Sequence, residues 1–206
     1  MKIFKILFFS LILCACASAQ RQQGGGIARK YPVFLQEGRV MVAFKVQVKA
    51  PGVQTYNAVL TINKNTDTEY KIKLLADFAT ILIDADFKDG RFYYRQVFGN
   101  LMDAKTTGAL EDIIRVLIVP PANYVNSFRD GGDFIVNFRE GDFLHRFHFR
   151  NSEIYPHKME QIKTIVRKKF LFLDYGVYDN LTLPGTIICE DGHNIVQVKL
   201  NLITVR

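Results

Sequence analysis

The sequence has no tryptophan, and its 206 residues include only three cysteines. Two of them, Cys14 and Cys16, lie near the N-terminus, which leaves Cys189 as the one cysteine of the remaining chain. Because a lone cysteine cannot form an internal disulfide, a disulfide-stabilised scaffold is excluded and Cys189 is expected to be a buried structural thiol. Apolar runs of about 20 residues, which a membrane-spanning helix needs, are also missing.

Residues 1–15 have the features of a secretion signal. Two early lysines precede the apolar run Ile6–Leu13, which is too short to span a bilayer. The small Ala15 precedes Cys16, and Leu13 lies three positions upstream of Cys16, as in a bacterial lipoprotein processing site. The sequence therefore predicts a signal peptide over residues 1–15 and a lipoprotein with an acyl anchor of the palmitate class on Cys16.

Two alternatives remain for this segment. Cys14 is the poorer acceptor, because the bulky Leu13 precedes it, and Ala17–Ala19 followed by Gln20 looks like an A-x-A site for ordinary secretion. Ala17 also bears on the destination of a lipidated chain. In enterobacterial lipoproteins an Asp at this position favours the inner membrane, so by that resemblance the outer membrane is favoured here.

The rest of the chain has the length of one domain. Residues 16–30 hold a Gln- and Gly-rich stretch and are expected to be a lipidated N-terminus with a flexible tether, and residues 31–206 a single β domain. Loss of the signal lowers the formal charge from +7 to +5, and the surplus is scattered. The one tight basic run, Arg167–Lys169, is interpreted as a solvated element end, with lipid headgroup contact as the alternative. No nucleic-acid-binding motif is present.

Apolar residues alternate with a period of two from residue 40 onward, which is typical of half-buried strands. Turn residues divide residues 40–98 into an expected five-strand antiparallel meander, whose last turn is Asp89–Gly90. Residues 106–118 change to helical spacing and end before Pro120. The loop that follows, up to Asp133, is unusually apolar for a connection.

Strands resume at Phe134–Phe149, the stretch 154–173 is ambiguous, and alternation is clear again from Thr186 to Val205. The chain thus predicts a mainly β protein with an antiparallel sheet of roughly ten strands and one helix inserted midway. Seventeen Phe and nine Tyr crowd the strands. They indicate either a filled aromatic core or a curved sheet around an apolar ligand cavity.

Catalytic and metal-binding patterns are weak in this chain. His145 and His148 are three apart on an expected strand, so they point to opposite faces and cannot share a metal. Neither glycine cluster has the spacing of a phosphate-binding loop, and no Gly-x-Ser-x-Gly elbow is present. We therefore expect no catalytic residues, no metal, no cofactor and no enzyme activity; an envelope hydrolase lacks any supporting constellation.

Three stretches together resemble the periplasmic lipoprotein carrier and outer-membrane lipoprotein receptor family (LolA/LolB-like), especially its membrane-anchored branch. Glu37–Val40 looks like the Gly-Arg start of that branch, Leu74–Ala79 like its leucine-rich strand and Pro-Leu-Gly step, and Leu183–Leu200 like its closing hairpin. Asp77-Phe78-Ala79 replaces Pro-Leu-Gly, the family's tryptophans are absent, and the helical insert is short. A related group of small outer-membrane lipoproteins with this fold fits equally well.

The resemblance implies a half-barrel antiparallel sheet with a helical lid. It also implies an outer-membrane lipoprotein, facing the periplasm, that binds acyl chains of lipoproteins or lipids and aids their transfer or insertion. A periplasmic carrier protein is an expected partner, and the chain is expected to be a monomer. Phe78 matches the receptor's protruding leucine and is expected to contact the membrane or that partner. The residues expected to line the cavity and lid are Val42, Phe44, Val46, Ile72, Leu74, Ile113, Ile114, Leu117 and Ile118.

The alternative comes from a different class of protein. A non-catalytic structural or assembly lipoprotein of the cell envelope would have a filled core and an exposed apolar patch for its partners. Period-two alternation does not separate the two, because it does not say which face of the sheet is hollow.

Overall fold

The computed structural model describes residues 29–32, 34–35, 40–50, 53–76, 80–98, 104–164, 166–191 and 196–206. The predicted signal peptide, Cys16, most of the tether and Phe78 lie outside these described residues. The predictions made for them, including the domain boundary at residue 31, therefore stay predictions.

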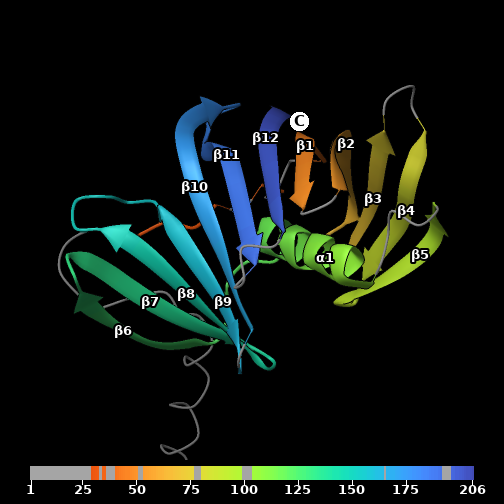
Figure 1. The fold of residues 1–206 in the computed structure, drawn as a ribbon. Helices are drawn as coiled ribbons and strands as arrows, with labels where there is room; N and C mark the ends of the chain where they lie inside the picture. Colours follow the sequence, from red (N-terminus) through yellow and green to blue (C-terminus); the bar gives the residue numbers. More distant parts are fainter. Residues whose placement is uncertain are drawn as a thin grey trace, which may run out of the picture.

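Within these described ranges, twelve strands form one open antiparallel sheet, and one helix lies between the fifth and sixth strands (Figure 1). The elements are β1 (Met41–Ala50), β2 (Val53–Thr66), β3 (Glu69–Ala76), β4 (Ile81–Lys88), β5 (Arg91–Val97), α1 (Ala104–Ile118), β6 (Tyr124–Asp130), β7 (Asp133–Glu140), β8 (Phe143–Arg150), β9 (Lys158–Lys163), β10 (Val166–Tyr178), β11 (Leu181–Asp191) and β12 (Gln197–Val205). The spatial order is β5-β4-β3-β2-β1-β12-β11-β10-β9-β8-β7-β6. The predicted fold class is confirmed.

The first meander pairs in the register that its alternation predicts. Val42 on β1 lies opposite Ile62 on β2, which in turn lies opposite Ile72 on β3. Every second residue of these strands therefore points to the same face, and the face with the apolar residues carries the helix. The closing hairpin is also present, because β11 and β12 pair antiparallel with Ile187 opposite Leu200.

The structure corrects one sequence-based interpretation and assigns one stretch that the sequence left ambiguous. The apolar loop before Asp133 is the edge strand β6, and the ambiguous stretch 154–173 contains β9 and the first half of β10. The alternation of β6 is hidden by a register shift between Tyr124 and Asn126. These strands explain why twelve are observed where roughly ten were expected.

The ladder between β10 and β11 is interrupted at one position without a change of register. Asp174 and Gly185 are left unpaired there, and Asp174 adopts a left-handed backbone with φ of 55°. A Cβ atom at the facing Gly185 would lie 2.9 Å from the Asp174 carbonyl oxygen and 2.8 Å from the Tyr178 hydroxyl. Glycine is therefore required there, and Leu183-Pro184-Gly185 lies inside a strand.

Helix α1 lies in the concavity of the sheet, across the half formed by β1–β5 (Figure 1). It begins two residues before the predicted start, and Pro120 and Pro121 follow its C-terminal end. Its 15 residues place Ile113, Ile114 and Leu117 against the sheet. Within the part of the chain that is described, no helix has the length and apolarity needed to cross a bilayer.

Candidate ligand groove

The concave face of the sheet, which we call the groove, has two halves. The first half is formed by β1–β4 and covered by α1, and it contains all nine residues predicted for the cavity and lid. Each of the nine side chains is at most 7% exposed. The structure therefore brings the predicted set together, but packs its strand and helix members against one another in one core. Their role in ligand binding stays a prediction.

The second half of the groove is an aromatic surface on β7–β9 that sequence reasoning did not assign to the site. Phe138 on β7 lies opposite His145 on β8, and Phe147 lies opposite both Val136 on β7 and Met159 on β9. The alternation of phenylalanines in these strands was visible in the sequence. It identified the strands, but only the curvature of the sheet shows that this face is the concave one.

The N-terminal segment, which comprises residues 29–32, 34 and 35, enters the groove. Tyr31 contacts a cluster of three phenylalanines edge-on, with ring centroids 4.9 to 5.6 Å away; these are Phe138, Phe147 and Phe149. Phe34 is fully buried and packs on Phe44 of β1, with ring centroids 5.2 Å apart. The sequence predicted that the folded part begins near Tyr31, but not that this segment fills the groove.

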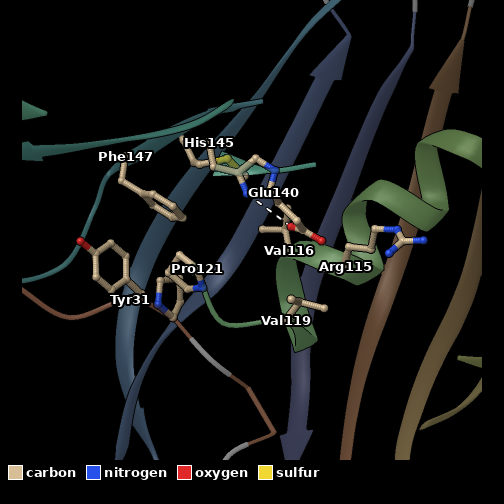
Figure 2. A pocket seen from close by; sticks show the side chains of 10 residues that line it. Tyr31, Arg115, Val116, Val119, Pro121, Glu140, His145 and Phe147 are labelled. Atoms are coloured by element: carbon tan, nitrogen blue, oxygen red, sulfur yellow. Dashed lines mark ion pairs between the residues drawn. The ribbon is translucent and has the colours of Figure 1, made fainter. Parts of the chain in front are cut away.

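A small pocket with a mixed polar and apolar lining remains where the two halves meet (Figure 2). Its space is about 10 Å³, which is on the order of one water molecule. Figure 2 shows Tyr31 beside Phe147, with Val116 of α1 and Val119, which follows the helix, on the other side of the pocket. The His145 Nδ1 atom lies 3.8 Å from a carboxylate oxygen of Glu140.

Polar contacts hold α1 to both halves of the sheet. The Lys168 ammonium on β10 pairs with the Asp112 carboxylate, and the Tyr94 hydroxyl on β5 donates a hydrogen bond to Glu111 at 2.5 Å. The Arg115 guanidinium lies 5.2 Å from the ring centroid of Phe87. The first two contacts come from strands on opposite sides of the groove, so the helix bridges it.

Burial changes the ionisation of two groups on this face. It lowers the pKa of His145, against the opposing effect of Glu140 and Asp112, so the imidazole is held neutral. It raises the pKa of the Cys189 thiol to about 12. The predicted burial of Cys189 is confirmed, and its thiol is a poor nucleophile at neutral pH.

The convex face carries the other described histidines. His148 lies 3.5 Å from Asp133 and from Glu160, and His157 lies 3.4 Å from Asp133. The prediction that His145 and His148 point to opposite faces is confirmed. Among the described residues, no three His, Cys, Asp or Glu side chains are placed to hold a metal ion.

Comparisons with known proteins identify the architecture. No family model matches the sequence, and no curated protein matches it. A LolA superfamily protein from Nitrosomonas europaea aligns with a TM-score of 0.64 over 85% of this chain and 88% of its own, at 12% identity. The chain has a LolA-like fold. A DUF1329 family protein from Desulfovibrio piger aligns with this fold at a TM-score of 0.51 over 82% and 86%, at 9% identity.

At these identities the likeness shows the LolA-like fold alone. This likeness does not distinguish the membrane-anchored receptor branch from the carrier branch. The receptor branch was suggested by residues around Gly38 and Phe78, and these two residues lie outside the described part. What the structure adds is a groove whose walls are almost entirely apolar and whose opening is covered by α1 and the N-terminal segment.

Proposed function

We propose that this protein is a non-catalytic lipoprotein that binds acyl chains of lipoproteins or lipids in the groove. It is anchored in the outer membrane through Cys16, faces the periplasm, and aids the transfer or insertion of its cargo. The observation that supports this most directly is the continuous apolar concave face beneath one amphipathic helix. Burial of an acyl chain there contributes about 0.8 kcal/mol for each methylene removed from water, so binding needs no charged or catalytic group.

Binding requires that α1 moves. The groove is closed in this structure, and an incoming chain exchanges its contacts for those that Ile113, Ile114 and Leu117 make with the sheet. The Lys168–Asp112 pair is the polar contact that must break when the helix swings away from β10. Because ligand binding costs the contacts between the helix and the sheet, the ligand can be released again. Transfer of the cargo to a membrane or a partner requires this release.

A second candidate function follows from the tight packing of the same groove. A structural or assembly lipoprotein needs a filled core, and the pocket at the junction of the two halves has room for about one water. It also needs exposed apolar surface for its partners, and Tyr124, Val125 and Phe128 on β6 are between 39% and 51% exposed.

One experiment separates the two functions. The chain from residue 21, purified without its anchor, is analysed by native mass spectrometry and titrated with an environment-sensitive apolar dye against acylated peptide and free lipid. Co-purified lipid, or dye displaced at one-to-one stoichiometry, supports the carrier. A clean apo mass without saturable dye binding supports the structural lipoprotein. In parallel, Cys16→Ser should move the full chain from the membrane fraction to the soluble fraction, and retention in the membrane would contradict the anchor.

Phe78, in the connection between β3 and β4, is proposed to touch the membrane or the delivering partner. Phe78→Glu should reduce transfer of a labelled lipoprotein to liposomes by roughly ten-fold or more while leaving dye affinity unchanged, because a carboxylate is costly to insert among acyl chains. Phe98→Glu is the matched control, since Phe98 is 52% exposed at the end of β5. Equal transfer by Phe78→Glu and the unmodified chain would remove this role.

A further inference from the structure

The N-terminal segment occupies the aromatic half of the groove in the way that a ligand does. Tyr31 points its ring into the cluster of Phe138, Phe147 and Phe149, and the Arg29 guanidinium lies over the Phe134 ring at 3.8 Å from its centroid. Phe34 and Leu35 are 0% and 4% exposed. These residues thus present aromatic and apolar side chains to an apolar wall.

This segment is not part of the sheet. Its described residues are tied by two backbone hydrogen bonds to the rest of the chain, from Lys30 N to Ile154 O at 2.9 Å and from Phe34 N to Leu117 O at 3.4 Å. The twelve strands pair with one another without it. Its release therefore costs side-chain contacts in the groove but breaks no strand pairing.

The segment also contacts both halves of the groove and the helix α1. Phe34 contacts β1 through Phe44 and α1 through the Leu117 carbonyl, whereas Tyr31 lies on β7 and β8. Tyr31 and Pro32 line the remaining pocket together with Val116 of α1 (Figure 2). Release of the segment would empty the aromatic half and remove packing from α1 in one step.

We propose that the N-terminal segment is a built-in occupant of the groove, with Tyr31 filling the aromatic half, and that a saturated acyl chain binds in that half by displacing the segment. The proposal rests on the acyl-chain function proposed above and names the part of the groove that the chain takes. Because the segment is covalently attached, it competes at a high effective concentration. The apparent affinity for the ligand is the intrinsic affinity multiplied by the fraction of molecules in which the segment is released. Weakening the contacts of the segment increases this fraction and so raises the apparent affinity.

The test uses the full chain in lipid nanodiscs that contain a palmitic acid analogue with a diazirine. Light-induced crosslinks to peptides of β7 and β8 are quantified by mass spectrometry. The variant Tyr31→Ala/Phe34→Ser should raise the crosslink yield there by at least about five-fold. The matched control Tyr93→Ala/Phe98→Ser removes two aromatic residues of β5 and its C-terminal end that are 51% and 52% exposed, and should leave the yield unchanged.

A second measurement needs no mutation. Hydrogen–deuterium exchange of the unmodified chain, with and without palmitic acid, should show faster exchange in peptides covering residues 29–35 when the ligand is bound, and unchanged exchange in β1. Crosslinks of equal yield in both chains, or slower exchange of the segment on ligand binding, would overturn the displacement while leaving the acyl-chain function intact. Complete absence of groove crosslinks in both chains would overturn the acyl-chain function and the displacement together.

Discussion

Burial under the groove lowers the reactivity of the Cys189 thiol. It lies on β11 between Phe170 and Val198, and burial raises the pKa of its thiol to about 12. The thiolate is the form that reacts with alkylating agents. The local run of apolar residues was enough to predict burial of this side chain, but its position beneath α1 and beside the Lys168–Asp112 pair comes from the tertiary structure.

We expect Cys189 to resist iodoacetamide at pH 8 in the folded protein and to react at least about 100-fold faster in urea, because both access and the thiolate fraction rise on unfolding. The rate is measured by intact mass spectrometry over time. Lys168→Met, which removes the ion pair to Asp112, should accelerate the native reaction if α1 moves as a lid. Native alkylation as fast as that of the unfolded chain would contradict the buried position.

The described histidines make stability sensitive to acid. Burial is the largest cause that lowers the pKa of His145, His148 and His157 below the ordinary value of 6.5. As the pH falls below that value, the unfolded chain binds protons before the folded chain does, so the folded state loses stability. The stabilisation by neutral histidines is therefore present at pH 7.5 and is lost as the pH drops through the lower folded pKa values.

We expect the urea midpoint to fall between pH 7.5 and pH 5, and to fall less in His145→Gln, which keeps a polar side chain next to Gln161 without a titrating group. Urea unfolding followed by circular dichroism at both pH values checks this. The same pH dependence in variant and unmodified chain would show that His145 does not contribute to it.

At the scale of elements, α1 was the easiest to predict and β6 the hardest. The helix follows from the spacing of Leu110, Ile113 and Leu117, which is a local property of the sequence. The apolar residues of β6 do not alternate, a register shift follows Tyr124, and the strand has one strand neighbour in the described sheet, so no regular pattern marks it. It exists because β7 offers it an edge to pair with, which is a non-local cause.

Two glycines test the packing of an element against the helix propensity of a single position. Gly185→Ala places a Cβ atom 2.9 Å from the Asp174 carbonyl oxygen and should destabilise the protein by about 1–3 kcal/mol. Gly108→Ala in α1 meets nothing within 4 Å and should stabilise it by about 1 kcal/mol through helix propensity. Free energies of unfolding from urea titrations measure both changes. Equal effects of the two substitutions would contradict the close approach of β10 and β11.

At the scale of the whole molecule, the sheet is open and has two edge strands, β5 and β6. Both edges carry exposed apolar side chains, including Val97 and Phe128. Unprotected edges of this kind tend to pair with other chains at high concentration. The expectation of a monomer therefore applies to dilute protein.

We expect Phe128→Lys to weaken self-association by roughly five-fold at high protein concentration, because like charges facing each other across a strand pair cost up to about 1 kcal/mol. Sedimentation velocity over a concentration series measures the change. Ile203→Lys is the control, since Ile203 is 54% exposed on β12 inside the sheet. A larger effect of the control than of Phe128→Lys would place the association surface elsewhere.

The sequence by itself determined the class of the fold, the five-strand meander, the helix and the sharing of one face by residues such as Val42 and Ile72. These follow from side-chain period and turn residues, which act over a few positions. Only the tertiary structure decided which face is concave and that β7–β9 line the second half of the groove. It also decided that Tyr31 fills this half while Phe34 packs on Phe44 in the first half. Period-two alternation is the same on a convex and a concave strand, and the N-terminal segment is placed by contacts with residues far away in the chain. The site was therefore predictable as a list of apolar positions, whereas its present occupant was not.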